Sequence, residues 1–243
     1  LMPVMGIDPS LTHLGWVLLN EKEQGRKALL NHGTFTTTPS DGLMVQRLIM
    51  QRERVKKFLV DNKLKFVSME APVLEDFNSE LLFALNNYLH EVFLNLGVFV
   101  IQIQPMTLKK SAKPLMNPHD VTKHHMVHQA KTELGMHGKR FSEHVSDAYF
   151  AGKMGSRFYQ WHILREITDD DLTESEQHVF CGKHTFTRGV KKGFTEYTGI
   201  IYKPNERFWD YSKIPRKTKN IIKEIQNGHP KGNKHRRLLQ KAK

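Results

Sequence analysis

The stretch Met5-Gly6-Ile7-Asp8-Pro9-Ser10 is followed closely by Leu14-Gly15-Trp16-Val17-Leu18-Leu19. Two apolar runs joined by a short turn predict a β-hairpin at the start of a sheet. Asp8 ends the first run, where its carboxylate would lie on a face of that sheet. A lone charge is costly in such a setting unless it is paired or holds a metal ion. The hairpin therefore predicts a functional acid at Asp8.

Two further acids occur in comparable settings. Glu70 ends the apolar run Phe66-Val67-Ser68-Met69, and Asp147 lies within His144-Val145-Ser146-Asp147-Ala148. Acids brought together from distant strands and a helix form an oxygen cage for Mg²⁺, the hard cation of phosphate chemistry. The i, i+3 spacing places His144 and Asp147 on one helix face, so both can address one site. Glu143 is close enough in sequence to compete with Asp147 as the metal ligand.

The chain has 243 residues and a formal net charge of +12. This excess makes nucleic acid the first partner to consider, ahead of an anionic membrane surface. Cys181 is the single cysteine, which excludes an internal disulfide framework and fits a reducing intracellular compartment, such as cytoplasm, nucleoid or organelle matrix. No apolar stretch approaches the roughly 18 residues of a membrane span, so we expect no membrane partner.

Apolar periodicity predicts an α/β protein. A meander of three strands is followed by alternating helices and strands, which is typical of a mixed sheet with flanking helices. The expected strands cover residues 3–8, 14–20, 28–38, 66–70 and 98–104. The expected helices cover residues 43–62, 78–96, 120–134 and 144–157.

The pattern weakens after Trp161, which predicts three regions: a domain at 1–160, a small extension at 161–211 and a basic tail at 212–243. β-favouring pieces at 184–187 and 195–202 indicate a small hairpin in the extension. Residues 203–243 contain 13 Lys and Arg against 3 Asp and Glu, so most of the excess charge lies there. Such a segment is typical of a solvated, disordered arm that adds non-specific affinity for nucleic acid.

Four motifs resemble those of the RuvC-type Holliday-junction resolvases, within the RNase H-like nuclease superfamily. The resemblance spans roughly residues 3–155, and its elements follow the family's order. The motifs are Gly6-Ile7-Asp8-Pro9 with Gly15-Trp16, Ser68-Met69-Glu70, Gln104-Pro105 followed by Lys109-Lys110, and His144-x-x-Asp147-Ala148.

The resemblance implies an RNase H-like fold, a homodimer, and cleavage of DNA junctions with divalent metal. We expect two Mg²⁺ ions per active site, replaceable by Mn²⁺, with Asp8 bridging them and Glu70 and Asp147 completing the cage. His144 would assist by positioning water, holding a metal or contacting the scissile phosphate. Val73 stands where the family often has an aromatic wedge for the junction, and Leu74 or Phe77 is the alternative for that role.

Basic side chains predict the DNA contacts. Lys109, Lys110 and Lys123 are the candidates for backbone contacts near the site, because phosphate contacts position a substrate without reading its sequence. In the tail, the candidates for non-specific phosphate contacts include Arg216, Lys217, Arg236 and Arg237.

These observations favour a metal-dependent, structure-selective endodeoxyribonuclease that resolves four-way junctions in DNA recombination and repair. One alternative keeps the metal site and changes the substrate to other branched DNA or to RNA–DNA hybrids. A second alternative is a nucleic-acid-binding or structural protein built on a nuclease fold that has lost catalysis. The presence of Asp8, Glu70 and Asp147 argues against the second, because clustered charges are costly to keep without a function.

Overall fold

The computed structural model describes residues 3–20, 22–23, 25–72, 79–137, 141–180, 183–185 and 195–197. Two compact units divide the chain at residues 1–203 and 204–243, and all of the second unit lies outside the described residues. Within the described part, no helix is both long and apolar enough to cross a membrane.

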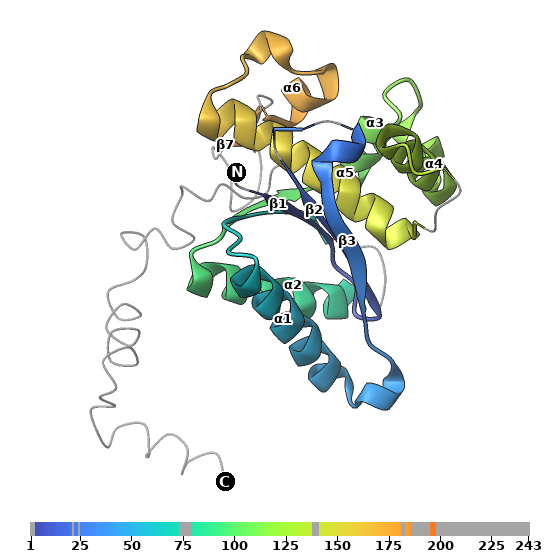
Figure 1. Ribbon diagram of the computed structural model, residues 1–243, viewed down its shortest axis with the longest axis vertical. Helices are drawn as coiled ribbons and strands as arrows, with labels where there is room; N and C mark the ends of the chain where they lie inside the picture. The colour runs from blue at the N-terminus through green and yellow to red at the C-terminus, as the bar shows by residue number, and fades with distance from the viewer. Residues whose placement is uncertain are drawn as a thin grey trace, which may run out of the picture. The chain divides into compact units, whose positions relative to one another are not determined.

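A five-stranded mixed sheet forms the centre of the first unit, with the strand order β3-β2-β1-β4-β5 (Figure 1). The strands are β1 (Val4–Asp8), β2 (His13–Leu19), β3 (Leu29–Thr36), β4 (Phe66–Glu70) and β5 (Phe99–Ile103). Strands β1, β2 and β3 pair antiparallel, whereas β4 pairs parallel with both β1 and β5. The predicted meander and mixed sheet are therefore confirmed.

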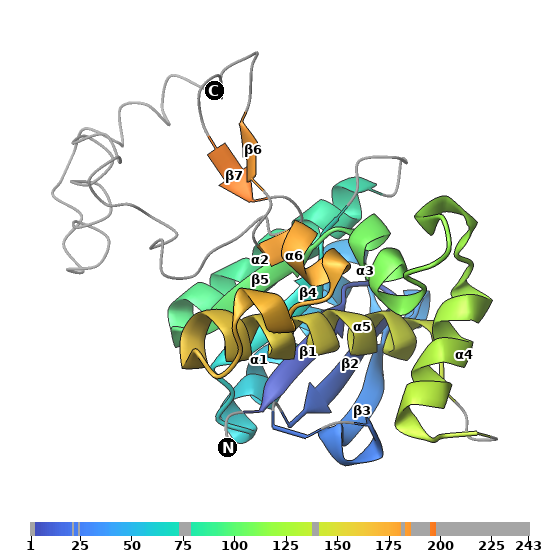
Figure 2. The same cartoon turned by 90° about the horizontal axis from the view of Figure 1, so that it is seen from above.

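Helices cover both faces of the sheet (Figures 1 and 2). The helices α1 (Met44–Asp61) and α2 (Ser79–Leu96) lie on one face. On the other face lie α3 (Pro105–Ala112), α4 (Lys123–Leu134) and α5 (Glu143–Phe158). Each face has its own apolar core, because alternate strand residues point to opposite sides. In β1, Met5 and Ile7 face α1 and α2, whereas Val4 faces α5.

The same alternation assigns the acids to a face. Asp8 lies an even number of residues from Val4, and Glu70 an even number from Phe66, and both of these apolar residues belong to the α5 core. Asp8 and Glu70 are also the last residues of neighbouring parallel strands. Their side chains therefore leave the sheet at one edge, on the side that α5 covers.

Short elements complete the first unit. They are η1 (Gly25–Ala28), η2 (Pro39–Asp41), η3 (Pro118–Asp120), the π-helical η4 (Tyr159–Leu164), η5 (Asp169–Asp171), α6 (Glu174–Phe180), β6 (Lys183–Thr185) and β7 (Thr195–Tyr197). The last two pair antiparallel and form the hairpin expected in the extension.

Three elements differ from the sequence expectations. Helix α3 begins at Pro105, which we expected only to end a strand. Proline suits the first turn of a helix, because a backbone N–H would have no partner there. The helix expected from Asp120 begins at Lys123, since the Thr122 Oγ1 accepts a hydrogen bond from the His125 N–H and caps it. Helix α6 was not expected.

The extension shares the core of the first domain. Leu172 and Phe180 are buried in the same apolar cluster as Phe158 of α5. The rings of Phe158 and Phe180 meet edge to face, with centroids 5.3 Å apart. The boundary expected after residue 160 therefore falls inside the first compact unit.

Candidate active site

Helix α5 crosses the sheet at backbone contact distance, because the strands present glycines beneath it. A Cβ built on Gly6 would lie 2.0 Å from the carbonyl oxygen of Ala148, and one on Gly15 would lie 2.2 Å from that of His144. Neither position therefore accepts a side chain. The buried Ser68 Oγ also donates a 2.7 Å hydrogen bond to the Ala151 carbonyl. These contacts place the first turns of α5 beside the ends of β1 and β4.

Three carboxyl groups influence one another at this edge. Burial and the charge of Asp147 raise the pKa of Asp8 well above its usual range, although a hydrogen bond with Glu70 partly opposes this. Burial and the charge of Asp8 likewise raise the pKa of Glu70. Burial is also the main reason that the pKa of Asp147 rises from its usual 3.8 to about 6. The site thus concentrates negative charge in a place that water solvates poorly.

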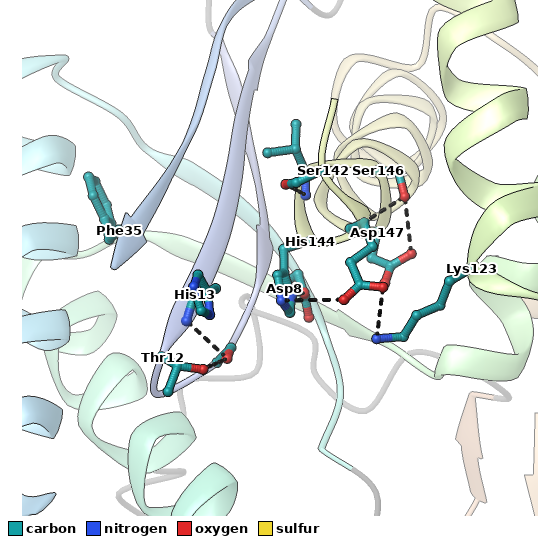
Figure 3. Close-up of polar contacts among 12 residues, drawn as sticks. Asp8, Thr12, His13, Phe35, Lys123, Ser142, His144, Ser146 and Asp147 are labelled. Atoms are coloured by element: carbon teal, nitrogen blue, oxygen red, sulfur yellow. Dashed lines mark hydrogen bonds and ion pairs between the residues drawn. The ribbon is translucent and has the colours of Figure 1, made fainter. Parts of the chain in front are cut away.

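His144 contacts this cluster directly (Figure 3). Its Nδ1 lies 2.7 Å from Oδ2 of Asp8. Burial lowers the pKa of His144, which favours the neutral imidazole at neutral pH. In the neutral form, a hydrogen bond donated from Nδ1 to Asp8 leaves Nε2 unprotonated and able to accept a proton.

Glu143, the competitor of Asp147 as a metal ligand, lies at the outer side of this histidine. Its Oε2 pairs with Lys123 Nζ at 3.3 Å, and its Oε1 lies 3.9 Å from His144 Nε2. Glu143 is about half exposed, whereas Asp147 is the acid whose charge acts most strongly on Asp8. The charge of Glu143 also raises the pKa of Asp8, but less than the charge of Asp147 raises it. The geometry therefore favours Asp147 as the third acid of the cluster.

The predicted DNA contacts divide into three groups. Lys109 and Lys123 lie near the acids, since the charge of Lys109 lowers the pKa of Glu70 and that of Lys123 lowers the pKa of Asp8. Lys110 instead donates a 2.6 Å hydrogen bond to the carbonyl of Pro114. The other candidates lie outside the described residues: Phe77, Leu74, Arg216, Lys217, Arg236 and Arg237.

One residue beside the cluster was missed from the sequence. The ring of His13, the first residue of β2, stacks on that of His144, with centroids 5.7 Å apart and planes inclined by 3°. The available signal was strand alternation: His13 and Gly15 share a face of β2, and Gly15 is where β2 meets the backbone of His144.

The donor set fits a hard divalent cation. Asp8, Glu70 and Asp147 offer carboxylate oxygens, which are the ligands that Mg²⁺ and Mn²⁺ prefer. Burial is the largest cause of their raised pKa values, so the ionised carboxylates are costly there unless a cation accompanies them. Among the residues that the structure describes, no group of three or more His, Cys, Asp and Glu side chains is arranged closely enough to hold a metal ion as it stands. The fit therefore rests on the chemistry of the donors and on their common location.

A cavity of about 490 Å³ lies elsewhere, along the C-terminal half of α5 and the loop after β2. Its charged walls are paired internally. Glu133 accepts hydrogen bonds of 2.8 Å from both Tyr149 and Lys153, and Arg157 donates one of 2.9 Å to Glu176. The cavity therefore lacks the uncompensated charge that marks the acidic cluster.

Two solved structures from Thermus thermophilus resemble the chain. One is RuvC in complex with a Holliday junction substrate, with 19% sequence identity and a TM-score of 0.54. The other is a RuvC structure with 21% identity and the same TM-score. Each comparison covers 67% of this chain and 96% of the RuvC chain. No protein-family model matches, and no curated protein matches in sequence. The first unit of this chain therefore has the fold of RuvC, within the RNase H-like class.

Proposed function

We propose that this protein is a metal-dependent endonuclease that resolves four-way DNA junctions. The observation that carries this function is the meeting of Asp8, Glu70 and Asp147 beside His144, at the strand ends of a RuvC-like fold. The similar structure of RuvC bound to a Holliday junction supports the choice of substrate. The net charge of +12 supports a polyanionic partner.

Asp8, Glu70 and Asp147 would hold Mg²⁺, with Mn²⁺ as a substitute and two ions per site. A divalent ion bound there supplies Lewis-acid stabilisation of the phosphate and lowers the pKa of a bound water. The cluster's own carboxylates would need to lose their protons before they ligate an ion, so metal binding should release protons.

His144 is assigned to proton transfer. In the tautomer whose Nδ1–H donates to the Asp8 carboxylate, Nε2 is the nitrogen that can accept a proton from the attacking water. The lowered pKa of His144 supports this role, because a neutral imidazole is the form that can act as a base.

Lys109 and Lys123 would contact DNA phosphates on either side of the acids. Phosphate contacts fix the position of a duplex arm, whereas the branched shape of the DNA would determine where cleavage occurs. Resolution of a four-way junction requires two symmetric cuts, and we therefore propose that the protein acts as a homodimer.

The test is cleavage of a synthetic four-way junction beside linear duplex, fork, flap and RNA–DNA hybrid, each with Mg²⁺ or with EDTA. Wild type is compared with Asp8→Asn. Paired symmetric nicks confined to the junction, and absent with EDTA and in the variant, are the expected result. Cleavage mainly of another substrate would retain the metal site and replace the substrate. Binding without cleavage under any metal would contradict the nuclease function.

A further inference from the structure

His13 and His144 form a stacked pair at the edge of the acidic cluster (Figure 3). The two rings are nearly parallel, at 3°, with a centroid separation of 5.7 Å, which corresponds to an offset stack. His13 is exposed, whereas His144 is partly buried. One face of the His144 ring is thus covered by His13, which is neither one of the three acids nor one of the basic candidates for DNA contact.

The backbone holds His13 firmly in this place. His13 pairs with Thr36 in the β2–β3 ladder, and its N–H donates to Ser10 Oγ at 3.3 Å. The preceding turn is held as well, because the buried Gln51 donates a 3.1 Å hydrogen bond to the Leu11 carbonyl. The position of the His13 backbone therefore follows from the sheet register.

Two contacts together restrict the orientation of His144. The hydrogen bond to Asp8 fixes one edge of the imidazole, yet the ring can still rotate about that bond. A flat neighbour at 3° to the ring opposes this rotation. With both contacts present, Nε2 points in one direction.

We propose that His13 is a positioning residue, which holds the plane of His144 so that Nε2 faces the scissile phosphate region. This role rests on the proposed nuclease function. His13 would act through the flat face of its ring and not through its own nitrogens. An exposed histidine beside a nuclease site could instead bind DNA phosphate, and the two roles predict different behaviour in substituted proteins.

The experiment measures single-turnover cleavage of the junction and, separately, the Kd for the junction with Ca²⁺ in place of Mg²⁺. We expect His13→Ala to slow single-turnover cleavage about 3- to 10-fold, the rate equivalent of a lost aromatic stack. Its Kd should stay within about twofold of wild type, since no phosphate contact is lost. His13→Phe, which keeps a flat ring without nitrogens, should restore the rate.

Thr12→Ala is the matched control, because Thr12 is an exposed neighbour in the same turn, and its side chain makes a long 3.5 Å contact with Ser10 Oγ. It should cleave at the wild-type rate. The positioning role would be overturned if His13→Phe cleaved as slowly as His13→Ala and both variants bound the junction with a higher Kd. That result would favour a phosphate contact. An unchanged rate in His13→Ala would overturn the positioning role too.

A second readout needs no cleavage. The ring protons of His144 are followed by NMR in the metal-free protein and identified by their loss in His144→Gln. Removing the neighbouring ring in His13→Ala should shift them, and His13→Phe should keep them displaced in the same sense. Wild type that cleaves no tested substrate would contradict the nuclease function. If wild type cleaved the junction but the His144 ring protons did not shift in His13→Ala, only the role of His13 would be contradicted.

Discussion

The two ends of α5 carry opposite kinds of electrostatics. At the N-terminal end, Asp147 faces Asp8 and Glu70, and each of the three carboxyl groups has a raised pKa. At the other end, Lys153 is paired with Glu133 and Arg157 with Glu176. The second arrangement balances its charge within the fold. The first leaves an excess of negative charge, which a cation from solution can offset.

Charge pairing distinguishes a structural end of α5 from a candidate functional end more clearly than the position of the cavity does. The cavity of about 490 Å³ borders the balanced end, where Tyr149, Lys153 and Arg157 all have protein partners. Paired charges of this kind hold helices in register, whereas perturbed and unpaired acids are typical of catalytic sites. We therefore assign the candidate functional site to the end with the uncompensated acids and not to the end that borders the cavity.

The largest expected effect is loss of cleavage in Asp8→Asn. The substitution keeps the shape of the side chain and removes one ligand charge, and we expect the single-turnover rate to fall at least about 1,000-fold. DNA affinity should be equal or tighter, because a negative charge leaves the site. Cleavage within tenfold of wild type would show that the acidic end is not catalytic.

The next effect is a pH-dependent gain in stability in Asp147→Asn, measured by urea unfolding in EDTA. The pKa of Asp147 is raised in the folded protein to about 6, from its usual 3.8. Below pH 3.8, Asp147 therefore makes its full contribution to the free energy of unfolding. This contribution is lost as the pH rises through 6. The variant cannot ionise, so at pH 7 it should be more stable than wild type by about 2–3 kcal/mol.

At about pH 4 the two proteins should unfold with nearly equal free energies, since Asp147 is then mostly protonated in the native state. Mg²⁺ should reduce the difference at pH 7, because the ion binds native wild type. If the difference in free energy of unfolding between the two proteins stayed constant across this pH range, it would contradict the raised pKa of Asp147.

The balanced end should respond in the opposite sense. Arg157→Met leaves Glu176, whose side chain is 9% exposed, without its cation. We expect the free energy of unfolding to fall by about 1–3 kcal/mol, because breaking one partner of a buried pair leaves an uncompensated charge. The folded variant should cleave at the wild-type rate, and the double variant with Glu176→Leu should recover stability. If Arg157→Met and wild type had equal free energies of unfolding, the Arg157–Glu176 pair would not stabilise the fold.

Much of the fold follows from local sequence pattern. The hairpin around Asp8, the run ending at Glu70 and the helix containing Asp147 were all predicted, since each depends on periodicity and turn residues within its own segment. Helix α6 and the burial of Phe180 were not, because they depend on contacts with α5 that no short window contains. His13 was missed for a related reason: strand alternation places it on the same face as Gly15, but its ring partner is 131 positions away and no short window contains both.

A smaller effect concerns salt dependence. Lys109→Gln and Lys123→Gln should each reduce the slope of log K against log salt by about 1, if each lysine neutralises one DNA phosphate. Lys153→Gln is the matched control, because its charge is engaged with Glu133 at the other end of α5. Junction binding measured over a series of salt concentrations gives the slopes. Equal slopes in all four proteins would argue against phosphate contacts at the acidic end.

The smallest expected effect is at Glu143, the half-exposed first residue of α5. Its carboxylate pairs with Lys123 and approaches Nε2 of His144, so it occupies space that a DNA phosphate would compete for. Glu143→Gln removes this competing charge and should tighten junction binding about two- to threefold at low salt, in keeping with the small energies of exposed ion pairs. The gain should vanish in the Lys123→Gln background, because Glu143 then has no cation to withhold from DNA. Weaker binding, together with lost cleavage, would instead identify Glu143 as a metal ligand and enlarge the acidic cluster to four.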